Sequence, residues 1–188
     1  KIITTGGGGM ILTNNKKVAN KAKYITNQAK DDPIYSIHNE VGYNFRLPNV
    51  LAALGLAQLE SLSKYIKKKK IIHERYKKKI NSIKSLSISS TPSHASSNYW
   101  LNILEINKKL SKKKLSKIIK YLYKNNIQVR PLWHPNHLQK EYRNCQTYKL
   151  KNINNIYKNR LCLPSSSQLT VKQQNFICKK INFFFKRN

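Results

Sequence analysis

The first fifty residues change from short apolar runs to helical spacing and then to an irregular stretch. Residues 2–5 (IITT) and 10–13 (MILT) are β-branched or apolar runs typical of strands, with four glycines between them. In residues 16–29 (KKVANKAKYITNQA) the apolar positions recur at helical spacing, which predicts an amphipathic helix. Residues 34–49 mix polar and aromatic side chains without a period and indicate a loop, of a kind that is often functional.

The middle of the chain predicts one long helix. From Pro48 to Asn81, apolar and small residues keep helical spacing, and the lysine runs KKKK and KKK are expected to face water. Such a helix is about 50 Å long at 1.5 Å per residue. We therefore expect it to connect two domains, formed by residues 1–81 and 82–188.

The last hundred residues have the pattern of a small α/β unit. Residues 82–97 are serine-rich and form a predicted linker with a short strand near 86–89. Strands are predicted at 99–106, 127–130 and 160–163, helices at 110–123, 153–159 and 169–184, and a loop at 131–141. Thr170 is the expected N-cap of the last helix. The fold class predicted for the chain is α/β.

The charge balance raises the question of a nucleic-acid partner. The formal net charge is +30, from 37 Lys+Arg against 7 Asp+Glu, which is typical of proteins that bind polyanions. Lysine far outnumbers arginine, however, whereas base readout and bidentate phosphate contacts favour arginine. An A+T-rich coding sequence would also supply lysine, asparagine and isoleucine, so we favour compositional drift and do not expect nucleic acid as a partner.

The cysteines and the lengths of the apolar runs indicate in which cellular compartment the protein is expected. Cys145, Cys162 and Cys178 are odd in number and widely spaced, which favours a reducing cytoplasm over a disulfide framework or a zinc knuckle. No apolar run approaches the roughly 20 residues of a membrane helix, so we expect no membrane partner. Because residue 1 is lysine, we expect the chain to be a piece of a longer protein.

Four blocks carry a resemblance to a known family: KIITTGGGGM at 1–10, HNEVGYNFRLPNVLAALGLAQLE at 38–60, RPLWHPNHLQ at 130–139 and LCLPSSSQLT at 161–170. In order and spacing they resemble the C-terminal half of the pyridoxal-phosphate-dependent nucleotide-sugar aminotransferases of the DegT/DnrJ group. The likeness is greatest to the branch acting on UDP-linked 4-keto-6-deoxy amino sugars. It implies the end of the large domain of a fold-type-I aminotransferase, a connecting helix and the small α/β domain.

The resemblance makes Lys1 the catalytic residue and the covalent attachment point of the cofactor pyridoxal 5′-phosphate. A lysine amine with a lowered pKa can bond to the cofactor aldehyde and shuttle a proton. The glycines that follow would let the backbone pass close to cofactor or partner. Many relatives carry glutamate within this glycine run, and this chain has only glycine. Without the resemblance, a solvated lysine beside a flexible hairpin tip is the alternative.

In the second block the resemblance assigns Asn44 to the cofactor phosphate of a partner subunit, which implies a homodimer with shared active sites. Nearby Arg46 is a substrate-binding candidate that could add positive charge. For Asn44 a loop-capping amide is the alternative. For His38 we expect a loop histidine bonded to the backbone rather than a catalytic group.

The third block supplies the remaining substrate-binding candidates, Arg130, Trp133 and His137. Arg130 could pair with an anion and Trp133 could stack on a ring. Packing of a small-domain loop is the alternative for all three. Relatives often carry lysine where this chain has His134. A metal site built from His134, His137 and Cys145 is not expected, because the spacing is generic and prolines interrupt it.

The resemblance implies transamination of a 4-keto nucleotide sugar, with glutamate as amino donor, in surface-polysaccharide or nonulosonic-acid biosynthesis. In this family the carboxylate that pairs with the cofactor ring nitrogen and the stacking aromatic lie upstream of the position of Lys1. We therefore expect the fragment to be inactive alone. The alternatives are a basic nucleic-acid-binding domain and a truncated, non-catalytic relic of such an enzyme.

Overall fold

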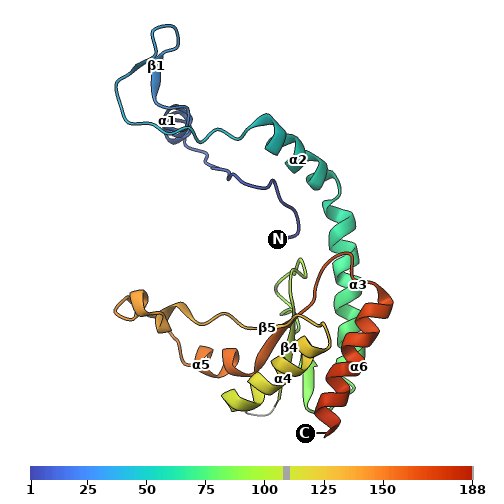
Figure 1. Cartoon of the computed structure of the whole chain (residues 1–188). Coiled ribbons are helices and arrows are strands. Elements are labelled where there is room, and N and C mark those ends of the chain that lie inside the picture. The colour runs from blue at the N-terminus through green and yellow to red at the C-terminus, as the bar shows by residue number, and fades with distance from the viewer. Residues whose placement is uncertain (108–110, 188) are drawn as a thin grey trace. The chain divides into compact units, whose positions relative to one another are not determined.

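The computed structural model describes residues 1–107 and 111–187, and Figure 1 shows the course of the chain. It divides into two compact units, Lys1–Ser63 and Lys64–Asn188. Most of the residues of the helix expected to connect two domains belong to the second unit, so the units divide earlier than the predicted domain boundary at 81/82. The domain boundary at 81/82 stays a prediction.

The first helix, α1, spans Lys16–Thr26. The Asn15 side chain caps it by accepting hydrogen bonds from two backbone N–H groups of the first turn, at 3.0 and 3.3 Å. The helix ends three residues before the predicted end at Ala29. Gln28 (φ 68°) and Ala29 (φ 47°) adopt left-handed conformations, which turn the chain out of the helix.

The predicted loop at 34–49 contains part of a small hairpin. Strand β1 (Lys30–Asp32) pairs antiparallel with β2 (Ile37–His38), with an irregularity in β1. The Asp32 carboxylate accepts hydrogen bonds from two backbone N–H groups at the turn, at 2.7 and 2.9 Å. An aspartate that bonds its own turn in this way sets the hairpin locally.

The two strands predicted in the first thirteen residues are wrong. Neither 2–5 nor 10–13 forms a strand in this structure. A strand needs a neighbour to pair with its backbone groups, and the polar contacts here are local instead: the Gly6 N–H donates to Thr4 Oγ1 at 3.0 Å.

The predicted helix at 48–81 is two helices, α2 (Asn49–Glu60) and α3 (Leu62–Ile80). Ser61 between them leaves the α-helical hydrogen-bond pattern. Helix α2 is apolar around its whole circumference and has no buried residue in this structure.

Helix α3 buries one face, formed by Lys69, Ile72, His73, Tyr76 and Ile80. The burial of Lys69 corrects the prediction, because the run KKKK to which it belongs was expected to face water. Lys69 lies three and four residues before Ile72 and His73 and is therefore on the same face of the helix. Its side chain donates hydrogen bonds to the carbonyl oxygens of Trp100 (3.2 Å) and Ser165, and burial lowers its pKa.

The second unit is built on a four-stranded sheet in the order β3-β4-β6-β5, with every neighbouring pair antiparallel. The strands are β3 (Leu86–Ile88), β4 (Asn102–Ile106), β5 (Arg130–Pro131) and β6 (Arg160–Leu163). Since β4 and β5 both run opposite to β6, they are parallel to each other and the helix between them is a crossover.

The core lies on one face of this sheet, because the strands alternate buried and partly exposed residues in register. Leu104 is opposite Leu161 on one side and Ile88 on the other, and all three are buried. Helix α3, α4 (Lys112–Lys124) and α6 (Val171–Arg187) complete the cluster with Ile72, Tyr76, Ile80, Ile118, Leu122, Ile177, Cys178, Ile181 and Phe184. Figure 1 shows α3 and α6 side by side. The result is a two-layer α/β unit, as the sequence predicted.

The starts of β4, β5 and α4 differ from the predicted starts of these elements. Strand β4 begins three residues after Tyr99, whose φ of 53° interrupts the extended backbone. A strand was predicted at 127–130, but β5 comprises only Arg130–Pro131, so the strand starts three residues later than predicted. Helix α4 is capped by Ser111, and Leu110, its predicted first residue, lies outside the described residues.

The last helix confirms its predicted cap. Thr170 Oγ1 accepts a hydrogen bond from the Gln173 N–H at 3.2 Å, and the Gln173 side chain accepts one from the Thr170 N–H at 2.9 Å. This reciprocal pair is a capping box.

The short elements before β6 agree with the prediction of a loop followed by a short helix. They are the 3₁₀ turns η1 (Asn136–Leu138) and η2 (Lys140–Tyr142), the helix α5 (Ile153–Ile156) and the turn η3 (Tyr157–Asn159). Among the residues that the structure describes, no helix is both long and apolar enough to cross a bilayer.

Candidate active site

The glycine run lies close to Leu47 and to Leu51 at the start of α2. Gly6 (φ 82°) and Gly8 (φ 102°) adopt conformations that other residues rarely take. A Cβ on Gly8 would come within 2.6 Å of Leu47, and one on Gly55 of α2 within 2.8 Å of Thr5. These close approaches, and not a strand, set the path of the backbone that follows Lys1. Lys1 itself is exposed in this structure.

The backbone on either side of Asn44 is held against the end of α1. The Tyr43 N–H donates to the Ile25 carbonyl at 2.8 Å, and the Phe45 N–H donates to the Thr26 carbonyl at 3.0 Å. Asn44 is thereby fixed in position by its neighbours, while its own side chain is exposed.

A glycine makes this close approach possible. A Cβ on Gly42 would lie 2.3 Å from the backbone nitrogen of Ala29, so that only glycine fits between the two segments. Tyr43 and Phe45 stack on each other with ring centroids 5.0 Å apart. The segment that carries Asn44 is therefore locally ordered.

Asn44 and Arg46 line one cavity of about 1060 Å³ within the first unit. Its walls are the glycine run, α1 and the segment that leads into α2. Arg46 Nη1 donates to the Asn27 side-chain oxygen at 3.3 Å. Asn27 also pairs with Asn44 in an isolated antiparallel β-bridge, so the guanidinium is held close to Asn44. An amide and a guanidinium on one wall are donors of the kind that bind phosphate oxygens.

His38 is bonded to the backbone, as predicted. Its Nδ1 lies 2.7 Å from the carbonyl oxygen of Gln28, across the β1–β2 hairpin. Nearby, the Tyr24 hydroxyl donates to the Asp31 carboxylate at 2.9 Å. Desolvation and this hydrogen bond raise the pKa of Tyr24 to about 12. The backbone N–H of Asn39 and the Tyr24 hydroxyl lower the pKa of Asp31. These contacts join α1 to the β1–β2 hairpin, and we assign them a structural role.

In the second unit the structure brings together Arg130 and Trp133. Both line a cavity of about 610 Å³, and both are exposed. The Trp133 ring lies 5.8 Å from that of Trp100, with an angle of 31° between their planes. Cys162, directly opposite Arg130 in the neighbouring strand, also lines the cavity, and burial raises the pKa of its thiol.

His137 does not line this cavity. It lies in η1, and its Nε2 is buried without a hydrogen-bond partner among the described residues. His134 does line the cavity and packs edge-on against Tyr157, with ring centroids 5.9 Å apart. Of the three predicted substrate-binding residues of this loop, two share a cavity and His137 lies apart from it.

Trp100 and Cys162 are the residues of this cavity that sequence reasoning missed. Cys162 could have been found from the alternation of β6, where Leu161 and Leu163 point into the core and Cys162 must point away. Trp100 precedes β4, and no local pattern indicates that it meets Trp133. In the part of the chain that the structure describes, no group of three or more His, Cys, Asp or Glu side chains could hold a metal ion.

Comparison with known proteins decides the family. The model of the DegT/DnrJ/EryC1/StrS aminotransferase family matches residues 1–182. The chain belongs to this family. The match includes both groups of predicted site residues and confirms the resemblance seen in the four sequence blocks.

Individual relatives of the family agree with this assignment. EpsN of Bacillus subtilis is 33% identical over 189 residues, which are 98% of this chain and 48% of EpsN. The GDP-perosamine synthase of Escherichia coli O157:H7 is 31% identical over 186 residues, 98% of this chain and 49% of that enzyme. The chain spans about half the length of the curated relatives it matches.

A solved aminotransferase structure confirms the fold. Helicobacter pylori PseC, an aminotransferase involved in the biosynthesis of pseudoaminic acid, matches with a TM-score of 0.85 at 24% identity. The match covers all of this chain and 51% of PseC. The chain therefore has the fold of one half of a pyridoxal-phosphate-dependent sugar aminotransferase.

Proposed function

We propose that this chain is the C-terminal half of an aminotransferase that moves an amino group from glutamate to the 4-keto carbon of a nucleotide sugar. The pathway would be surface-polysaccharide or nonulosonic-acid biosynthesis in the cytoplasm. The observation that carries the proposal is the family match over residues 1–182, which begins at the lysine of the motif KIITTGGGGM. A relative named for making GDP-perosamine supports a nucleotide sugar as the substrate.

Lys1 is the proposed catalytic residue. Bound pyridoxal phosphate would supply the aldehyde that accepts the amino group and a ring that withdraws electrons. The Nζ of Lys1 would hold the cofactor in the resting enzyme and move a proton at the substrate carbon. The glycines after it support the proposal, since Gly8 (φ 102°) has a backbone conformation that residues with a side chain rarely adopt and leaves the following backbone free of side chains.

Asn44 and Arg46 are the proposed contacts for phosphate. The backbone bonds of Tyr43 and Phe45 hold the segment, so that the Asn44 amide would be presented with little loss of conformational freedom. In the homodimer that we propose, Asn44 of one subunit would bind the cofactor phosphate of the other, and Arg46 would contribute charge on the substrate side.

Arg130, Trp133 and His137 are the proposed substrate contacts of the second unit. Arg130 could form paired hydrogen bonds with a diphosphate, and the exposed Trp133 ring offers a surface for a flat base or sugar. The cavity shared by Arg130 and Trp133 supports their part of the proposal. His137 is outside that cavity and would need to move, or to act through the loop that holds it.

The fragment alone is expected not to bind the cofactor tightly, because half of the family fold is outside it. The test is a chimera in which the half of Bacillus subtilis EpsN that precedes its match is fused to Lys1 of this chain. Borohydride reduction with pyridoxal phosphate, followed by mass spectrometry of the peptides, should find the cofactor on Lys1 in the chimera and not in the separate chain.

Two variants of the chimera separate the roles. Lys1→Ala should abolish the covalent label and leave the fold intact, and Asn44→Ala should weaken cofactor binding by about tenfold, the value of a hydrogen bond to a charged group. Labelling that persists in Lys1→Ala, or falls on another lysine, would remove the proposed role of Lys1.

A further inference from the structure

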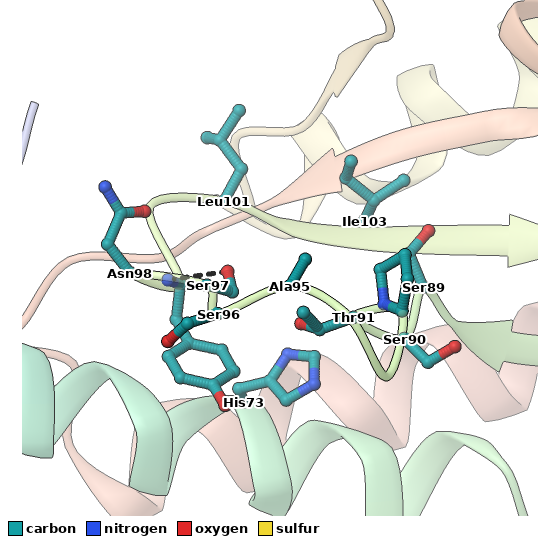
Figure 2. A pocket seen from close by; sticks show the side chains of 12 residues that line it. His73, Ser89, Ser90, Thr91, Ala95, Ser96, Ser97, Asn98, Leu101 and Ile103 are labelled. Carbon is teal, nitrogen blue, oxygen red and sulfur yellow. Dashed lines mark hydrogen bonds between the residues drawn. The ribbon is translucent and has the colours of Figure 1, made fainter.

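A second cavity in the second unit is lined by uncharged hydrogen-bonding groups. It has a volume of about 530 Å³, within the range of small-molecule sites. It lies between α3, β4 and the serine-rich segment 89–99, and Figure 2 shows the side chains around it. None of the residues proposed for cofactor or substrate binding lines it.

The base of this cavity is His73 of α3. The residue is 6% exposed, and its ring stands below the segment 89–99 in Figure 2. Its Nδ1 lies 3.0 Å from the side-chain oxygen of Asn102. The ring of Tyr99, a residue with a φ of 53°, lies 4.9 Å from the imidazole.

The neighbouring bonds decide which ring nitrogen carries the proton. Ser165 Oγ donates to the Leu163 carbonyl at 2.8 Å and accepts from the Asn102 amide nitrogen at 2.9 Å. The Asn102 side chain therefore presents its oxygen to His73, whose Nδ1 must be the donor. In a neutral imidazole Nε2 is then an acceptor, and no bond to it is found among the described residues.

The other walls carry both donors and acceptors. Ser90, Thr91 and Ser96 have hydroxyls for which the described residues supply no hydrogen-bond partner. Leu101 and Ile103 form an apolar wall on the side of β4. No lysine, arginine, aspartate or glutamate lines the cavity, although the chain as a whole is strongly basic.

We propose that this cavity binds a neutral hexopyranose, with a sugar hydroxyl donating to His73 Nε2 and others bonding to the serine and threonine hydroxyls. A sugar ring has hydroxyls at its edge and C–H groups on its faces, which suits the combination of polar and apolar walls. An anionic ligand suits it less well, because no Lys or Arg side chain lines the cavity to pair with a negative charge. This inference is independent of the proposed aminotransferase function.

The test is an NMR titration of the full chain with D-glucose, and with D-glucuronate as a charged comparison. Saturable shifts of the amide signals of residues 89–99 are expected, with a Kd of about 1 mM. Glucuronate should bind more weakly. Absence of saturable shifts at about 50 times that concentration, or tighter binding of glucuronate, would overturn the proposal.

The variants locate the site. Ser96→Ala should weaken binding about three- to tenfold, the effect of one net hydrogen bond, while Ser93→Ala should not, since Ser93 is in the same segment but outside the cavity. Ala95→Leu enlarges a lining side chain on the segment 89–99, fills part of the cavity and should abolish binding. Unchanged affinity in Ala95→Leu, or equal weakening by both serine variants, would show that the sugar binds elsewhere. His73→Phe is the direct test of the acceptor and should lose binding in a chain whose amide spectrum stays folded.

Discussion

The Glu105 carboxylate on β4 lies 2.8 Å from Nη2 of Arg160, the residue directly opposite it on β6. Arg160 Nε donates to the same carboxylate oxygen at 3.0 Å, and the Ser89 hydroxyl donates to it as well. The pair lies on the sheet face away from α3, α4 and α6 and joins two neighbouring strands by side chains as well as by backbone.

This arrangement predicts a pH dependence of stability. Burial by itself would raise the pKa of Glu105. Hydrogen bonds from Ser89 and Arg160, together with the charge of Arg160, outweigh it, so the pKa is lowered from its ordinary value of 4.5. A lowered carboxyl pKa stabilises the fold above the unfolded-state pKa, and this contribution is lost as the pH falls through the folded-state pKa. The urea midpoint should therefore fall more steeply below about pH 4.5 in the parent than in Glu105→Gln.

Tryptophan fluorescence is a suitable measurement, because Trp100 and Trp133 are the only tryptophans and both belong to the second unit. Glu74→Gln, an exposed carboxyl on α3, is the control and should keep the pH dependence of the parent. Identical curves for the parent and Glu105→Gln would contradict the assignment.

Tyr76 links α3 to the loop after β6. The side chain is fully buried, and its hydroxyl donates to the Pro164 carbonyl at 3.0 Å. Tyr76→Phe keeps the ring but leaves that carbonyl without its donor, so we expect a loss of about 1–2 kcal/mol in the free energy of unfolding. Tyr123→Phe on α4, where the side chain is 48% exposed, should change it little. Urea unfolding followed by fluorescence measures both, and equal effects would argue against the buried bond.

Two glycines of the first unit should respond differently to the same substitution. A Cβ on Gly42 would collide with the backbone of Ala29 at 2.3 Å, whereas nothing lies within 4 Å of one on Gly9. Gly42→Ala should destabilise the packing of the Asn44 segment by about 1–3 kcal/mol, as in other overpacked sites. Trypsin cleavage after Lys23 should become faster in Gly42→Ala and stay unchanged in Gly9→Ala. A protected Lys23 site in Gly42→Ala would show that the segment relaxes without cost.

The cap of α6 makes a fourth prediction about stability. Thr170→Ala removes the oxygen that accepts from the Gln173 N–H and should cost about 1 kcal/mol, whereas Thr170→Ser keeps the oxygen and should cost little. Thermal unfolding monitored by circular dichroism distinguishes the two. Equal losses would mean that the threonine methyl group, and not the cap, stabilises this helix end.

The last prediction depends on the proposed function. In the chimera, Arg130→Ala should raise the KM for the nucleotide sugar about tenfold or more with a smaller change in kcat, because it removes charged hydrogen bonds to a bound diphosphate. Arg143→Ala, an exposed arginine that follows η2 and lies outside the cavity, is the control. Steady-state kinetics with each variant measures the difference, and a pure kcat effect of Arg130→Ala would move this residue to another role.

Sequence alone determined the features that depend on neighbours along the chain. The helix of α1, the strand β6 and the Thr170 cap all follow from spacing or bonding over a few residues, and the structure confirms them. The family, too, could be predicted, because the motifs at Lys1 and Asn44 are contiguous in sequence.

Tertiary structure decided the features that depend on distant neighbours. The run at 2–5 has strand-forming residues but no partner strand here, and Lys69 is buried because carbonyl groups of Trp100 and Ser165 accept its hydrogen bonds. The meeting of Trp100 with Trp133 likewise has no local signal. Backbone propensity acts within a turn or two, whereas strand pairing and burial of a polar group need partners that only the folded chain supplies.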